Sequence, residues 1–241
     1  MVTIDDVKDQ IIKAGKKSKL DCTDAYAVQY HILSLRNPSK RAIRSQGYNS
    51  VSQWIKSETS PRIGTVINAV ASLLGQFLPY KQEELVIEIV QSTAVDEAHL
   101  QGVARKLKIE ECAPQAQLAI ITTLTKSSKL NPEGLRDLGG KVIRLAMQNY
   151  GVNAELYAPL AVCVINAPKA NQWVLGNMGR DVLAAIHEFG FNYNSDLGPL
   201  LNPLIASAKM PDTIKCQLIA FARPQASSPP RTDLISPSPE P

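Results

Sequence analysis

The hydrophobic positions of this chain recur at helical spacing along most of its length. In residues 2–14, apolar side chains fall three or four positions apart, and Gly15 follows as a stop signal. A second apolar run follows Thr23 or Asp24, either of which suits an N-cap, and it ends before Pro38. Both segments are therefore predicted to form short amphipathic helices.

The same pattern continues after Arg62, where two apolar segments are separated by Pro79. One of them contains LVIEIV at residues 85–90, which is rich in β-branched residues, so a strand remains an alternative there. The helix is favoured because the flanking QEE and QST continue one helical face. Further helices are predicted at about 96–108, 114–124, 135–149, 156–165, 179–189, 200–209 and 212–222.

Local signals set several of these boundaries. Pro114 suits the first turn of a helix, and Gly151 suits the end of one. Polar loops are predicted at 127–134 and 166–172. No segment sustains the alternation of a half-buried strand, and no internal repeat is detected. The fold class is therefore predicted to be all-α.

Composition suggests three parts of the chain. Residues 1–62 contain eleven Lys or Arg and six acidic residues, together with Tyr48 and Trp54, a composition that suits an exposed basic arm. The apolar helices place the packed core in residues 63–223. Residues 224–241 are so rich in proline and serine that a disordered tail is expected.

Sequence motifs give little support to an enzyme or a bound cofactor. Loops that cradle nucleotides, nucleophile elbows and zinc-protease motifs are all missing, and His187-Glu188 near Asp181 is interpreted as a helix surface with a half-buried histidine. No apolar run approaches the roughly 20 residues that span a bilayer. The cysteines and histidines are too dispersed in the sequence for a metal site: Cys22, Cys112, Cys163, Cys216, His31, His99 and His187. The four cysteines are predicted to be buried thiols of a protein in a reducing, cytosolic compartment.

Basic residues near predicted helix boundaries are the strongest functional signal. The set is Lys126, Lys129, Arg136, Lys141, Arg144, Lys169 and Arg180. Phosphates bind where long cationic side chains meet free backbone N–H groups at helix starts, and serine hydroxyls add neutral donors. For any single lysine, a solvated helix face is the more common explanation. Taken together, the set predicts a phosphate-binding groove that includes Ser127, Ser128 and Arg136.

The order of landmarks in residues 89–189 resembles the core of the coat proteins of flexible filamentous plant viruses. Tyr157-Ala158-Pro159, followed by the segment PKANQW at 168–173, is similar to that family's Tyr-Ala-Pro and Pro-Ala-Asn-Trp segments. Where the family has an aspartate after the tryptophan, this chain has His187.

This resemblance implies a helical bundle of two small subdomains that encloses an RNA groove. It also implies an N-terminal arm that docks on a neighbouring subunit, and it identifies Ser127, Ser128 and Arg136 as RNA contacts. The complete set of predicted RNA-binding residues is Ser127, Ser128, Lys129, Arg136, Lys141, Arg144, Lys169, Arg180 and His187. Trp173 is interpreted as an anchor of the 166–172 loop.

The function predicted from the sequence is that of a viral coat protein, found in virions and host cytoplasm, that polymerises helically on single-stranded genomic RNA. Such binding must be nearly independent of sequence, because one groove meets every part of a genome. Two alternatives remain open: a nucleoprotein of a segmented negative-strand RNA virus, and a cellular helical adaptor that binds protein.

Overall fold

The computed structural model describes residues 2–35, 41–59, 62–149, 154–189 and 197–222, and within these ranges all regular structure is helical. The prediction of an all-α fold is confirmed, including the helix over LVIEIV. The α-helices are α1 (Ile4–Lys13), α2 (Asp24–Ser34), α3 (Arg41–Ser57), α4 (Arg62–Ser72), α5 (Pro79–Gln91), α6 (Glu97–Lys106), α7 (Pro114–Lys126), α8 (Pro132–Gln148), α9 (Ala154–Ile165), α10 (Gln172–Phe189), α11 (Gly198–Ala206) and α12 (Asp212–Ala222), with short 3-10 helices η1 (Leu74–Gln76) and η2 (Ile109–Glu111). The predicted tail, residues 224–241, lies outside the described residues.

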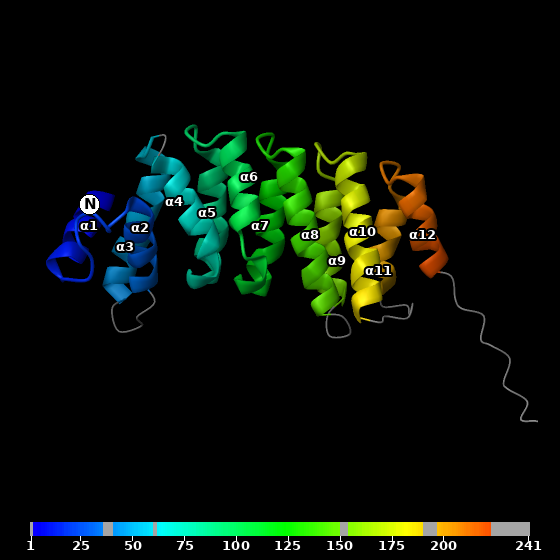
Figure 1. The fold of residues 1–241 in the computed structure, drawn as a ribbon, viewed down its shortest axis with the longest axis horizontal. Helices are drawn as coiled ribbons and strands as arrows, with labels where there is room; N and C mark the ends of the chain where they lie inside the picture. Colours follow the sequence, from blue (N-terminus) through cyan, green and yellow to red (C-terminus); the bar gives the residue numbers. More distant parts are fainter. Residues whose placement is uncertain (1, 36–40, 60–61, 150–153, 190–196, 223–241) are drawn as a thin grey trace, which may run out of the picture.

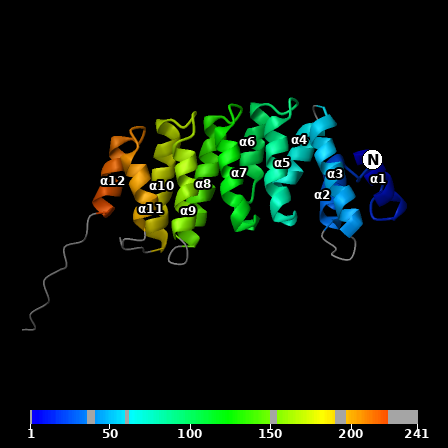
Figure 2. The same cartoon turned by 180° about the vertical axis from the view of Figure 1, so that it is seen from behind.

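The helices form an elongated array of two rows. Helices α2, α4, α6, α8, α10 and α12 pack one against the next, and α3, α5, α7, α9 and α11 do the same beside them. Figure 1 shows this succession along the long axis, with α1 near one end and α12 near the other, and Figure 2 shows the same order from behind. Each helix thus packs mainly on near neighbours in the sequence, as in solenoid proteins built from stacked helical hairpins.

The array contains a structural repeat that the sequence did not reveal. Three pairs of equivalent positions are each separated by 35 residues. They are the first residues of η1 and η2, the prolines that begin α5 and α7, and the buried glutamines Gln82 and Gln117. The Nε2 groups of the two glutamines donate to the carbonyl oxygens of Phe77 and Cys112, at 2.8 and 3.1 Å. The N–H of Ala113 also donates to Gln82 Oε1 at 2.9 Å, which joins one hairpin to the next.

Similar capping loops begin four helices of the first row, which is the row of α2, α4, α6, α8, α10 and α12. A side-chain oxygen accepts a hydrogen bond from the backbone N–H three residues later, and the residue before each cap is buried. The capping residues are Thr23, Asp96, Asn131 and Asn171. The last of these caps explains why α10 begins at Gln172, seven residues before the predicted start at Gly179. Trp173 therefore lies in the first turn of α10 and is 48% exposed, so the interpretation of Trp173 as a loop anchor is wrong.

The N-terminal helices are integrated into the array. Tyr48 and Trp54 are 6% and 2% exposed, although the composition of this region suggested exposed aromatic residues. Trp54 also donates a hydrogen bond from its indole to the carbonyl oxygen of Val2, at 3.0 Å. The two rings are buried because α2, α3 and α4 pack together.

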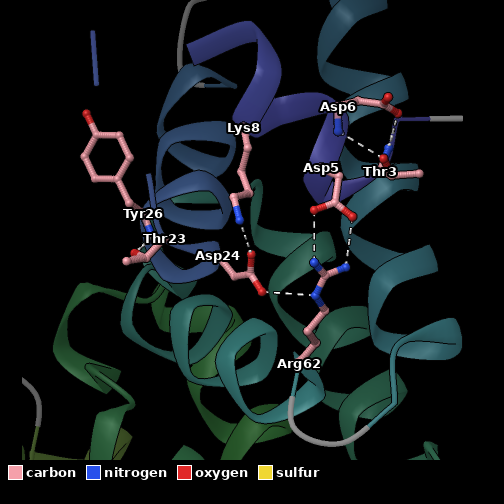
Figure 3. Close-up of polar contacts among 8 residues, drawn as sticks. All are labelled: Thr3, Asp5, Asp6, Lys8, Thr23, Asp24, Tyr26 and Arg62. Carbon is pink, nitrogen blue, oxygen red and sulfur yellow. Dashed lines mark hydrogen bonds and ion pairs between the residues drawn. The ribbon is translucent and has the colours of Figure 1, made fainter. Parts of the chain in front are cut away.

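Helix α1 is held by a cluster of ion pairs, drawn in Figure 3. The guanidinium group of Arg62, at the start of α4, donates to both oxygens of Asp5 at 2.9 and 3.1 Å and, through Nε, to Asp24 at 3.0 Å. Lys8 also pairs with Asp24, at 3.0 Å. These contacts hold the pKa of Asp5 below its ordinary value, mainly through the hydrogen bonds from Arg62. One arginine thus connects α1, α2 and α4.

Candidate nucleic-acid interface

A cavity of about 420 Å³ opens between α6, α8 and α10. Its charged lining comes from all three helices: Arg105 from α6, Arg136, Asp137, Lys141 and Arg144 from α8, and Asp181 and Glu188 from α10. Phe189, the last residue of α10, also lines it. Four basic side chains line this cavity, and it is the candidate site.

Two glycines of α8 determine how closely α10 approaches. A Cβ atom at Gly139 would lie 2.7 Å from Met178 Cγ, and one at Gly140 would lie 3.2 Å from Asp181 Oδ2. The first distance is too short for any larger residue without displacement of Met178. The second shows that Asp181 lies directly over the backbone of α8. The glycine pair thus allows close packing and places the carboxylate of Asp181 in the lining of the cavity.

The arginines of the cavity are exposed and have few partners. Among the residues that the structure describes, the guanidinium groups of Arg105 and Arg144 form no hydrogen bond or ion pair. Arg136 contacts its own neighbour Asp137, at 3.3 Å. Side chains with this freedom can turn toward an anion, and guanidinium groups match the geometry of phosphate oxygens. The arrangement can therefore bind phosphate without loss of structural contacts.

Asp181 is the unusual acid of this site. Its carboxylate is half-buried, and within the described ranges no donor forms a hydrogen bond with it. Burial raises its pKa, while the positive charges of Arg136, Arg144 and Arg180 act in the opposite direction. Asp181 therefore lowers the net charge of the cavity and provides a hydrogen-bond acceptor among groups that are mostly donors.

Two of the predicted RNA-binding lysines have structural partners instead. Lys141 Nζ donates to the backbone carbonyl of Arg105 at 2.8 Å and to that of Leu107, beyond the last turn of α6. Burial lowers its pKa. Lys129 Nζ donates to the carbonyls of Ser92, at 2.8 Å, and Val90, at 3.3 Å, at the end of α5. Both lysines thus donate to carbonyl groups at or just beyond helix ends, and the carbonyl of Ser92 also accepts from the N–H of Val95 at 3.2 Å.

Other predicted site residues do not line the cavity. Ser127 Oγ accepts a hydrogen bond from the backbone N–H of Lys129 at 3.2 Å, and Lys169 pairs with Glu97 at 3.3 Å. His187 is exposed on α10, where the interpretation of a half-buried histidine is wrong, and Glu188 lines the cavity in its place. The residues outside the lining are Ser127, Ser128, Lys129, Lys169, Arg180 and His187.

The residue that sequence reasoning missed is Arg105. Its relation to the site becomes visible once the helices of the first row are aligned by their caps. Arg105 and Arg180 each stand nine residues after a capping residue, Asp96 and Asn171, and Gly140 stands nine after the cap of α8. The register relates these positions but does not by itself identify a lining residue, because Arg180 at the equivalent position lies outside the cavity.

The described residues hold no group of three or more His, Cys, Asp or Glu side chains placed to bind a metal ion. Two of the four cysteines, Cys22 and Cys112, are buried as predicted. Cys163 is partly buried and Cys216 is exposed, so that prediction is wrong for Cys216, which lies on the outer face of α12. Among the described helices, none has the length and apolar character needed to cross a membrane.

Comparison with known proteins identifies no relative. No family model, no curated protein and no solved structure matches this chain.

Proposed function

We propose that the protein binds single-stranded RNA by its backbone phosphates, in the cavity between α6, α8 and α10. The observation that carries the proposal is the convergence of Arg105, Arg136 and Arg144, exposed and from two helices, on one concave surface. Contacts of this kind carry no base information, so binding is independent of sequence. The elongated array supports the proposal, since stacked helical hairpins provide extended surfaces for polymeric ligands.

The charge balance of the cavity favours moderate affinity. Four cationic side chains and three carboxylates line it. Lys141 is one of the four, and its ammonium group is already hydrogen-bonded to carbonyl groups. Because few cationic groups are available to phosphate, binding is expected to be moderate at low salt and to weaken as salt rises, with a slope set by that small number of contacts.

The narrower proposal is a coat protein whose copies assemble helically on genomic RNA, in virions and host cytoplasm. It rests on the resemblance of residues 89–189 to the coat proteins of flexible filamentous plant viruses, including the two subdomains and the docking arm of that family. Electron microscopy of the protein with and without RNA tests it. Long helical rods support a coat protein, and beaded rings support a viral nucleoprotein. Single copies bound to RNA would agree with RNA binding but contradict helical assembly.

A protein-binding adaptor is the second candidate, and one observation favours it. A shallow apolar hollow of about 560 Å³ lies over α7, α9 and α11, in the row that does not form the basic cavity. Its lining is Leu118, Ala158, Pro159, Val162, Cys163 and Pro199. A protein that acts through this hollow has no need of RNA, so the RNA-binding measurement separates the two functions.

The decisive experiment removes the two arginines of α8. Arg136→Ala combined with Arg144→Ala is expected to weaken binding to a 20-nucleotide RNA about tenfold or more, whatever its sequence. The slope of log affinity against log salt is expected to fall by about two units, one for each phosphate contact. Fluorescence anisotropy over a salt series measures both quantities.

The matched control removes two charges from the far end of the array. Lys13 and Lys19 are exposed, and neither makes an ion pair with any residue that the structure describes. Lys13→Ala with Lys19→Ala changes the net charge equally and should leave the salt slope almost unchanged. Equal effects of the two double variants would show that binding follows overall charge, and the proposed cavity would then be wrong.

A further inference from the structure

Three neighbouring helices of the second row, α7, α9 and α11, share a surface that is nearly free of charge. Charged residues make up 20% of the chain, yet α7 and α9 have one each, at or next to a helix end, and α11 has none. Helix α7 packs on α9, and α9 packs on α11, so the uncharged segments are contiguous. Depletion of charge distinguishes the centre of a protein–protein interface from ordinary surface.

The 35-residue repeat provides a comparison within the chain. In this register, Leu118 and Ala119 of α7 stand where α5 has Glu83 and Glu84. Leu118 is 44% exposed, and Glu84 is exposed as well. The fold therefore accepts carboxylates on this surface of the hairpin, and core packing does not require apolar residues there. An apolar surface where the fold accepts charge indicates a contact outside the monomer.

The same surface contains a projecting side chain and a hollow. The shallow hollow of about 560 Å³ extends over all three helices, and the exposed Leu118 stands at its edge on α7. The rest of the lining is aliphatic residues, two prolines and Cys163, so it offers no charged group to a ligand. It therefore suits an uncharged, apolar partner surface better than nucleic acid or a charged peptide.

We propose that two copies of the protein associate through α7, α9 and α11, about a two-fold axis. A two-fold contact sets a surface against its own copy, and like charges facing each other there are unfavourable. An uncharged face avoids this repulsion, and Leu118 of one copy can pack into the hollow of the other. The basic cavity is lined only by α6, α8 and α10, so the pairing does not involve it and is independent of RNA binding.

The available area fits a weak pair. Helices α7, α9 and α11 have 13, 12 and 9 residues, which corresponds to lengths of about 20, 18 and 14 Å. With about 9 Å between neighbouring axes, the face covers about 450 Å² in projection. Accessible area exceeds this because side chains make the surface uneven, so two copies bury about 1,000 Å² or slightly more, at the lower end of specific interfaces. We therefore expect a dissociation constant in the micromolar range.

Sedimentation velocity of the full chain without RNA, from about 1 to 100 μM, tests the pairing. The wild-type protein is expected to shift from one copy to two, and not beyond, because a two-fold contact is closed. Leu118→Glu introduces the residue that α5 has at the equivalent position, so the variant should fold. Its carboxylate would be buried unpaired in the contact, and we expect pairing to weaken about tenfold or more.

Trp173→Glu is the matched control. Trp173 is also a large apolar residue and is 48% exposed, but it lies on α10 in the first row. This variant loses similar apolar surface and gains the same charge, and it should pair as wild type does.

Thiol labelling of the wild-type protein locates the contact without any substitution. Cys163 lines the hollow, whereas Cys216 is exposed on α12. As the protein concentration rises through the pairing range, labelling of Cys163 should slow relative to that of Cys216, in proportion to the fraction paired. If Leu118→Glu does not fold, as judged by circular dichroism, this measurement decides the location of the contact.

Three results would overturn the proposal. A wild-type protein that stays monomeric over the whole range would leave the hollow to a different partner. Undiminished pairing of folded Leu118→Glu, or labelling of Cys163 that does not depend on concentration, would place the contact elsewhere. Species larger than two copies in the absence of RNA would exclude a closed two-fold pair.

Discussion

Replacement of Gln82 by leucine tests whether the array is held together by the polar link between hairpins. Gln82 is 2% exposed on α5. Its Nε2 donates to the carbonyl oxygen of Phe77 at 2.8 Å, and its Oε1 accepts from the N–H of Ala113 at 2.9 Å. Leucine fills a similar volume and forms neither bond, so the variant leaves one carbonyl and one N–H without partners while the apolar packing is largely retained.

The expected cost follows from the burial of those two groups. A buried polar group left unpaired costs about 1–3 kcal/mol. Phe77 is buried and bears the full penalty, whereas Ala113 is only partly buried, so water can recover part of the loss at its N–H. We therefore expect Gln82→Leu to reduce the free energy of unfolding by about 2–3 kcal/mol. Gln117→Leu should behave similarly, because Gln117 is buried and donates to two carbonyl groups.

Urea denaturation followed by circular dichroism measures the effect. Gln115→Leu is the matched control, since Gln115 is exposed in the first turn of α7, and its effect should stay within about 0.5 kcal/mol. A loss below about 1 kcal/mol for Gln82→Leu, with the same dependence on urea as wild type, would refute the reasoning. It would mean that water or a rearranged loop satisfies both backbone groups.

Three further predictions concern charge and thiol chemistry. Arg62→Met should lower the free energy of unfolding by about 1 kcal/mol, since its ion pairs are largely exposed, and added salt should shrink the difference from wild type in urea melts; a salt-independent difference would contradict the ion-pair origin. Cys216 should react with a thiol reagent at pH 8 while Cys112 stays unreactive until unfolding, because burial raises the pKa of Cys112 to about 12; mass mapping of labelled peptides decides this. Asp181→Asn should stabilise the protein at neutral pH by less than about 1 kcal/mol, given partial solvent screening. The raised pKa of Asp181 means that ionisation costs stability above the folded pKa, so thermal melts of the two proteins should converge as pH falls; a gain that persists at acidic pH would exclude this cause.

The sequence located most helices because the signals that begin and end them are local. Pro114 begins α7 as predicted. Helix α8 begins at Pro132, inside the predicted polar loop and three residues before the predicted start at Leu135. The start of α10 was missed because its cap, Asn171, stands among residues that also suit a loop. The 35-residue repeat escaped detection because few side chains recur, chiefly a proline and a buried glutamine, while the apolar positions repeat only in character.

The candidate site was predictable only within α8. Arg136 and Arg144 are two turns apart on one helix, so helical periodicity alone places them on the same face. Arg105 and Asp181 come from helices before and after it, and their approach depends on packing that passes over Gly139 and Gly140. Lys129 and Lys141 carry the same charge as the arginines, yet their ammonium groups meet backbone carbonyls at the ends of preceding helices.

By itself, therefore, the sequence determined the helices and their apolar faces, since these depend on spacing, caps and breakers within a few residues. The tertiary structure decided which charges face a ligand. A basic side chain near a helix boundary has the same local pattern whether it binds phosphate or completes a neighbouring helix end. The distinction depends on carbonyl groups more than thirty residues away, as for Lys141 and Arg105, and such contacts exist only once the rows have packed.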